Sequence, residues 1–217
     1  MTLALGHNSH TEGHCNLAVG ENSHAEGYIT QTFESAAHAE GTSTQAFGMA
    51  SHAEGNGTGA KGTVSHAEGE FSQAIGYASH AEGYLTTAEG YTAHAEGCIT
   101  FATADYSHAE GASTIASADY SHAEGYCTQA IGIASHAEGG STEDFERIYT
   151  IGSATYTIID TTAYGACSHA EGDHTFALGE ASHAEGYITA ATDYYSHAEG
   201  FGSAANDTAS HAEGYMT

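Results

Sequence analysis

The chain has 217 residues, with 28 glycines and no proline or tryptophan, and its 28 acidic residues against one lysine and one arginine give a formal net charge of −26. This charge excludes nucleic-acid binding by counterion displacement, which needs lysine and arginine, and electrostatic attachment to anionic membranes. Small side chains dominate and long aliphatic ones are scarce, so an ordinary core of leucine, isoleucine, valine and phenylalanine is not expected.

The chain is a tandem repeat with a period of 14 residues, marked by the string His-Ala-Glu-Gly. Histidine recurs at this spacing from His10 to His136 and again from His169 to His211, and only the first copy has threonine in place of alanine. Low complexity and high charge are typical of disorder, but a disordered chain has no reason to keep its register. The constant period instead predicts a stack of identical units, each of which buries one face only against its neighbours.

Each repeat contains two five-residue segments in which small and larger residues alternate. Counting the histidine as position 0, serine, alanine and glycine occupy −1, +1 and +3, and threonine or serine, alanine and glycine occupy +6, +8 and +10, as residues 65–78 illustrate. The alternation predicts two strands per repeat, whose small faces oppose each other in a thin interior. The apolar stripe of an amphipathic helix is absent. We therefore expect an all-β fold, a parallel β-roll solenoid of about 15 coils stacked about 4.8 Å apart.

The repeat is interrupted once, between His136 and His169, whose separation exceeds two full periods by five positions. We expect residues 1–139 and 161–217 to form β-roll repeats and residues 140–160 to form a degenerate coil with a five-residue insertion. In that coil, residues 148–152 and 154–158 match the second-strand and first-strand patterns. The insertion is expected within residues 140–147, as a solvated bulge or as a projecting ligand loop. The candidate ligand residues of this bulge are Glu143, Asp144, Phe145, Glu146 and Arg147.

The two outer faces of the predicted roll differ in how much they vary. Positions +7 and +9 hold many residue types, such as Leu17 and Val19 in one coil and Gly59 and Lys61 in another, as a solvent-exposed face permits. Positions 0 and +2 hold histidine and glutamate in every copy of the motif, which indicates a repeated, restrictive environment. A rotational symmetry axis along the roll supplies such an environment, so this histidine–glutamate column is predicted to be a subunit interface. Its residues are His10, Glu12, His24, Glu26, His38, Glu40, His52, Glu54, His66, Glu68, His80, Glu82, His94, Glu96, His108, Glu110, His122, Glu124, His136, Glu138, His169, Glu171, His183, Glu185, His197, Glu199, His211 and Glu213.

Three interpretations of the column remain open. In the first, it is a structural network of paired, hydrogen-bonded side chains that sets registry between subunits. In the second, imidazoles hold Zn²⁺ or Ni²⁺, although we assign no metal ligands here. In the third, histidine and glutamate act as acid–base catalysts. Fourteen copies with no nucleophile and no unique site indicate architecture instead, so no enzyme activity, catalytic residue or cofactor is expected.

The column also predicts a pH effect of one of two signs. Charged histidines paired with glutamate would have a raised folded-state pKa, and their stabilisation would be lost as the pH rises. Histidines buried in the neutral form would instead make acid dissociate the oligomer. Protonating all fourteen motif histidines would change the net charge of the chain from −26 to −12.

Several of the predicted strands match a known family in their residue pattern as well as in their period. Ser23-His24-Ala25-Glu26-Gly27 keeps the small residues of a Ser-Val-Ala-Ile-Gly strand, and residues 2–6, 16–20 and 175–179 keep its apolar character as Thr-Leu-Ala-Leu-Gly, Asn-Leu-Ala-Val-Gly and Thr-Phe-Ala-Leu-Gly. With the 14-residue period, these strands resemble the head repeats of trimeric autotransporter adhesins of the YadA type. The resemblance covers the chain apart from residues 140–160. Histidine and glutamate replace the family's valine and isoleucine, so the trimer interior would be polar, with room for water or ions.

The resemblance implies a left-handed β-roll, a homotrimer and adhesion to a host surface, a matrix protein, a glycan or other cells. It implies a location at the cell surface, with export and membrane anchoring outside this chain and no direct membrane contact in this segment. Similar His-Ala-Glu-Gly repeats also look like segments of phage tail proteins, so a tail-fibre shaft in a virion is an alternative, as is a metal-binding array. An ice-binding solenoid would need an outward lattice of threonine, whereas the threonine column at +6 is expected to point inward.

Overall fold

The computed structural model describes residues 2–140, 146–151 and 154–217. In these residues the chain is an all-β, parallel β-solenoid with no helix, as predicted, and it has about 14 turns where about 15 coils were expected. The described part contains no helix long and apolar enough to cross a bilayer. The chain forms two compact units, Met1–Tyr106 and Ser107–Thr217, called unit 1 and unit 2 below.

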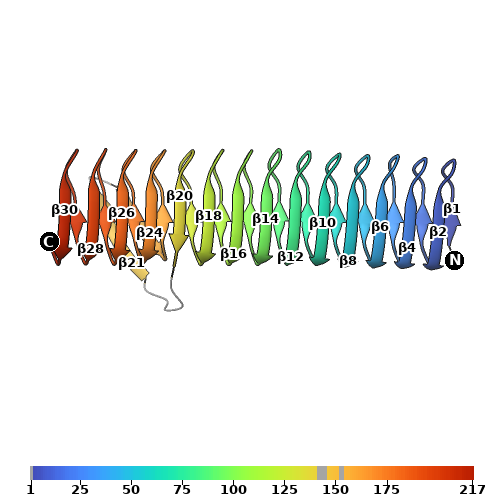
Figure 1. Cartoon of the computed structure of the whole chain (residues 1–217), viewed down its shortest axis with the longest axis horizontal. Coiled ribbons are helices and arrows are strands. Elements are labelled where there is room, and N and C mark those ends of the chain that lie inside the picture. The colour runs from blue at the N-terminus through green and yellow to red at the C-terminus, as the bar shows by residue number, and fades with distance from the viewer. Residues whose placement is uncertain (1, 141–145, 152–153) are drawn as a thin grey trace. The chain divides into compact units, whose positions relative to one another are not determined.

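Each turn contributes one long and one short strand, and the strands of each kind pair in parallel with those of the adjacent turns (Figure 1). The long strands of unit 1 are β2 (His10–His14), β4 (His24–Tyr28), β6 (His38–Thr42), β8 (His52–Asn56), β10 (His66–Glu70), β12 (His80–Tyr84) and β14 (His94–Cys98). Its short strands are β1 (Leu3–Ala4), β3 (Leu17–Ala18), β5 (Gln31–Thr32), β7 (Gln45–Ala46), β9 (Gly59–Ala60), β11 (Gln73–Ala74), β13 (Thr87–Ala88) and β15 (Phe101–Ala102).

Unit 2 repeats the pattern and adds one hairpin. Its long strands are β16 (His108–Ala112), β18 (His122–Tyr126), β20 (His136–Gly139), β24 (His169–Asp173), β26 (His183–Tyr187), β28 (His197–Phe201) and β30 (His211–Tyr215). Its short strands are β17 (Ile115–Ala116), β19 (Gln129–Ala130), β23 (Thr162–Ala163), β25 (Phe176–Ala177), β27 (Ala190–Ala191) and β29 (Ala204–Ala205). The hairpin consists of β21 (Glu146–Ile151) and β22 (Ala154–Ile159).

The interior is a thin layer of small side chains, as the alternation predicts. Ala67 at +1 and Ala74 at +8 are completely buried, and Ser65 at −1 is 2% exposed. The Ser65 hydroxyl donates to the Gly62 carbonyl at 2.7 Å, which satisfies a polar group that would otherwise be costly to bury. The threonines at +6, such as Thr100, are buried as expected. The solenoid therefore presents no outward threonine lattice of the ice-binding kind at this column.

The corners between strands hold left-handed residues that are not glycine. They stand at position −2, where Val64 has φ 53°, and at +5, where Ile29 has φ 59°. A branched residue is rarely found in this region because its Cβ crowds the backbone. The stacking of adjacent turns imposes the conformation, since Val64 N donates to the Met49 carbonyl of the preceding turn at 2.8 Å.

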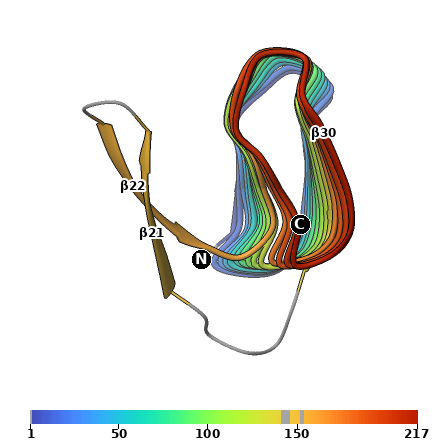
Figure 2. The same cartoon turned by 90° about the vertical axis from the view of Figure 1, so that its left-hand side faces the viewer.

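The predicted degenerate coil at residues 140–160 is wrong. β20 pairs directly with β24, and β19 pairs directly with β23, so the solenoid passes from one regular turn to the next. Residues 148–151 and 154–158, which were expected to occupy strand slots, instead lie in β21 and β22, which pair antiparallel with each other (Figure 2). The interruption is thus a single insertion, residues 141–159, within one period. The two strands of an antiparallel hairpin pair with each other, so the hairpin needs no place in the parallel stack.

Candidate functional site

The histidine–glutamate column is built by the first and third residues of each long strand. Successive side chains of a strand point to opposite faces, so these two share the outer face while the intervening alanine is buried. The register is in line from turn to turn, with His66 opposite His80 and Glu68 opposite Glu82. All predicted column residues hold these positions in long strands of the two units.

Histidine and glutamate of the same strand lie within ion-pair range in the long strands from His10 to His136 and in the strand of His197. The Nε2–Oε2 distance is 3.6 Å for His52 and Glu54 and 3.3 Å for His108 and Glu110, and the most distant pairs reach 3.9 Å. In the interior turns about one third of each histidine side chain is exposed, as with 35% for His52. Exposure is higher at the N-terminal end, where the His10 side chain is 63% exposed. The column is therefore a half-buried surface rather than a core.

Most imidazoles of successive turns stack on one another, whereas the rings of His10 and His24 meet edge to face. Ring centroids lie 4.8 Å apart for His66 and His80, with 6° between the ring planes, and 4.6 Å apart for the parallel rings of His108 and His122. This spacing follows from the strand spacing of a sheet. Stacked neutral imidazoles are compatible with such contact, whereas two adjacent imidazolium ions would repel each other.

Several Nε2 atoms on this surface are covered but have no hydrogen-bond partner within the chain. They belong to His24, His38, His52, His66, His122, His136, His169, His183 and His197. His80 differs, because its Nε2 lies 3.4 Å from Glu82 Oε2 in hydrogen-bond geometry. A covered polar atom without a partner is unfavourable, so the column offers a row of sites for a group from outside the chain.

Three histidines of the column, His52, His80 and His122, have a lowered pKa. Burial lowers the pKa of His52 below its usual value of 6.5, the neighbouring His38 and His66 lower it further, and glutamates 54 and 40 oppose the shift. Burial and adjacent histidines lower the pKa of His80 and of His122 in the same way. For these three histidines, covering by the stack outweighs the attraction of the glutamates.

The second predicted site, the bulge at residues 143–147, is placed only in part. Glu143, Asp144 and Phe145 lie outside the described residues. Glu146 and Arg147 begin strand β21, where their backbones pair with Ile159 and Ile158. The bulge of a solenoid coil expected here is replaced by this hairpin.

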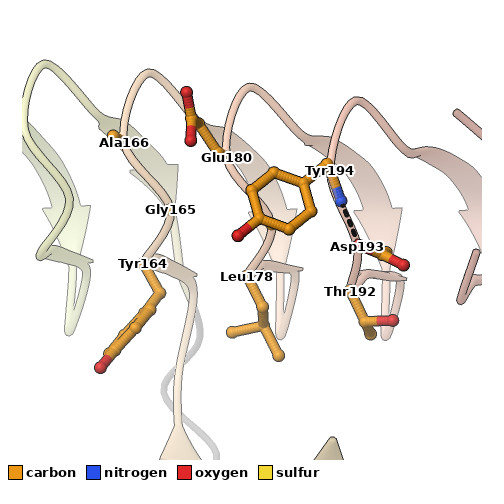
Figure 3. A pocket seen from close by; sticks show the side chains of 9 residues that line it. Tyr164, Gly165, Ala166, Leu178, Glu180, Thr192, Asp193 and Tyr194 are labelled. Carbon is orange, nitrogen blue, oxygen red and sulfur yellow. Dashed lines mark hydrogen bonds between the residues drawn. The ribbon is translucent and has the colours of Figure 1, made fainter. Parts of the chain in front are cut away.

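Sequence reasoning missed a shallow cavity of about 370 Å³ on unit 2. Tyr164, Leu178 and Thr192 occupy position +9 of successive turns and project from the same side (Figure 3). Asp193 and Tyr194 complete its rim, and the Tyr194 amide donates to Asp193 Oδ1 at 2.7 Å. The available signal was Asp193, which stands where most repeats have glycine at +10.

Models of known protein families do not match the chain, and curated proteins do not match it either. The column and the cavity are therefore the two candidate functional sites of the chain. Each of them is formed by side chains from several successive turns.

Proposed function

We propose that the chain is a non-enzymatic head or fibre segment that trimerises through its histidine–glutamate column and uses its variable surfaces for adhesion. The observation that carries the proposal is the row of half-buried imidazoles whose Nε2 atoms have no hydrogen-bond partner within the chain, as in His24, His38 and His52. A second and a third chain around a common axis bring glutamates and water to these atoms. Paired polar groups of this kind fix registry more than they add stability.

The resemblance to YadA-type head repeats supports a left-handed roll with three chains around the axis. In that arrangement the column occupies the place of the family's apolar interior. The stack itself favours a polar trimer interior, because each glutamate already lies 3.3–3.9 Å from the histidine of its own strand in the pairs from His10 to His136. The trimer interior is then a set of hydrogen-bonded layers, one for each turn.

Adhesion would use the corners and the variable face, where large side chains reach solvent. Tyr77 and Tyr91 are 47% and 43% exposed and stack with ring centroids 5.0 Å apart. Tyr164 and Tyr194, 43% and 53% exposed, flank the cavity on unit 2. Exposed tyrosines supply broad contact area with a polar tip, which suits a host-surface protein, a matrix protein or a glycan at the cell surface.

The oligomeric state tests the interface. Light scattering after size exclusion, with a chelator present, should give about three times the 22.2 kDa chain mass. Replacing His52, His66 and His80 by glutamate adds three like charges to the column and should yield monomers. The matched control replaces Gln45, Gln73 and Thr87 on the variable face by glutamate and should remain trimeric. A monomeric wild-type chain would defeat the proposal.

Adhesion is tested with the same proteins. The trimeric wild type and the control variant should bind to cells or matrix-coated surfaces, and the column variant should bind less through lost avidity. A Tyr164→Ala, Tyr194→Ala variant that remains trimeric and loses binding would place the contact at the cavity. Equal binding by wild type, column variant and cavity variant would contradict an adhesive role for these surfaces.

A further inference from the structure

We propose that unit 2 binds divalent transition-metal ions, of the Zn²⁺ class, at triads of two histidines from successive turns and one glutamate. The best-defined triad is His136, Glu138 and His169, whose ligand atoms all lie within 4.8 Å of one another. The three ligands belong to one chain, so the site does not depend on the homotrimer proposed above.

Two of the three ligands are already placed for a shared ion. His136 Nε2 and Glu138 Oε2 are 3.5 Å apart, close to the ligand–ligand distance of about 3.4 Å that tetrahedral Zn²⁺ imposes with bonds of about 2.0–2.1 Å. Their side chains are 34% and 30% exposed, so solvent reaches the pair while the strand holds its backbone. A water molecule completes the coordination from the open side.

The third ligand comes from the next turn. The rings of His136 and His169 stack with centroids 4.9 Å apart and 9° between their planes, and the backbones are in register. A change in side-chain torsion of His169 brings its Nε2 toward the ion without moving the strand. The Nε2 atoms of both histidines are covered and have no hydrogen-bond partner within the chain, so metal binding breaks no existing bond of these atoms.

The donor set selects the class of ion. Two neutral imidazoles and one carboxylate suit Zn²⁺, Ni²⁺ or Cu²⁺, whereas Ca²⁺ and Mg²⁺ require oxygen ligands. The chain's net charge of −26 attracts every cation, but only ions that bind imidazole gain from the triad. Discrimination between Zn²⁺ and Ca²⁺ therefore separates a coordination site from a general ion atmosphere.

The triads overlap, which fixes the stoichiometry. Within the described residues, the groups of two histidines and one glutamate are all in unit 2: 108/110/122, 122/124/136, 136/138/169 and 197/199/211. His122 and His136 each belong to two groups and serve one ion at a time. Three groups are filled together without sharing a ligand, so we expect about three Zn²⁺ ions per chain. The group of Glu171, His183 and Glu185 has a single imidazole and should bind more weakly.

Calorimetric titration of ZnCl₂ into the whole chain, without an affinity tag and stripped of metal, tests the proposal. The wild type should take up about three ions, and a 100-fold excess of Ca²⁺ should not change that number. His136→Gln removes both groups that contain His136 and should lower the uptake by one ion. His52→Gln removes the same kind of residue from unit 1, where no triad is found among the described residues, and should leave the uptake unchanged.

Circular dichroism of each metal-free variant checks that the variant folds. His197→Gln provides a second variant that should lose one Zn²⁺ ion. His197 belongs to the separate group 197/199/211, so this variant should also lose one ion even if His136→Gln fails to fold. Absence of Zn²⁺ binding by the wild type would overturn the proposal. So would equal losses in His52→Gln and His197→Gln, or displacement of Zn²⁺ by Ca²⁺.

Discussion

Gly200 stacks on Gly214 of the following turn so closely that a Cβ on Gly200 would overlap the Gly214 carbonyl oxygen. Gly200 has φ 104° and Gly214 has φ 124°, so both glycines of the motif adopt a conformation that L-residues rarely reach. Gly214 differs in its surroundings, because the nearest atom to a Cβ there is Thr217 Cγ2 at 3.5 Å. The pair separates the cost of the backbone conformation from the cost of contact between turns.

Gly200→Ala is therefore expected to destabilise the chain far more than Gly214→Ala. Gly214→Ala should lower the free energy of unfolding by about 1–3 kcal/mol through backbone strain alone. Gly200→Ala adds a clash with backbone that cannot move without breaking the sheet. This variant should therefore lose more than about 4 kcal/mol of unfolding free energy. Thermal and urea unfolding of both variants measure the difference. Equal costs would mean that the turns can separate locally.

The chain should lose stability in acid. Burial and neighbouring histidines lower the folded-state pKa of His52 and His80, so below the usual value of 6.5 the unfolded chain binds more protons than the folded one. The contribution of these histidines to the free energy of unfolding is then fully present above about pH 7 and is lost as the pH drops through about 6.5 and below. Melting temperatures across this range, at constant ionic strength and with a chelator, measure it.

The matched variant for the pH effect is His52→Gln, His80→Gln, which removes two histidines with a lowered pKa. Its melting temperature should depend less on pH over the same range. A wild-type melting temperature that rises on acidification would instead indicate charged, glutamate-paired histidines with a raised pKa.

Val64→Asn is expected to stabilise unit 1. Val64 has φ 53° and is 44% exposed, so it bears the strain of a left-handed branched residue with little burial in return. Asn22 stands at the same position of an earlier turn with φ 54°, and its Oδ1 accepts a hydrogen bond from Asn8 Nδ2 at 3.3 Å. The free energy of unfolding should rise by about 1 kcal/mol in Val64→Asn and fall by a similar amount in Asn22→Val. Changes of the same sign in both variants would contradict this explanation.

Deleting residues 141–159 should leave the solenoid intact. The deletion joins Gly140 to Asp160, whose φ of 87° has the sign found at position +5 of the other turns, and it restores the 14-residue spacing of His136 and His169. The β-strand signal in circular dichroism should persist, with a melting temperature close to that of the wild type. Deleting residues 114–132, a segment of equal length within the regular turns, instead breaks the register and should abolish cooperative unfolding. Loss of folding in both proteins would show that residues 141–159 are required by the turns beside them.

The inserted segment, residues 141–159, is also where the prediction from the sequence was wrong. Residues 148–152 and 154–158 carry the alternation of strands, and any strand that buries one face carries it, whether its partner is parallel or antiparallel. The spacing between His136 and His169 fits two periods with a short insertion as well as one period with a long insertion. Only the pairing of β20 with β24 decides between them. The cavity at Tyr164 and Tyr194 was missed for a related reason, because it joins side chains from three turns.

The sequence by itself determined the repeating turn, its two faces and its small-residue interior, because a period of 14 and an alternation of two leave one way to stack such units. Ala67 is buried and His66 lies on the outer face for that reason alone. The tertiary structure decided how the turns act on one another. The rings of His66 and His80 lie 4.8 Å apart, and the Nε2 atom of His66 is covered. Contact between turns forces Val64 into a left-handed conformation. Such effects depend on distances between neighbours in space, which no pattern along the chain specifies.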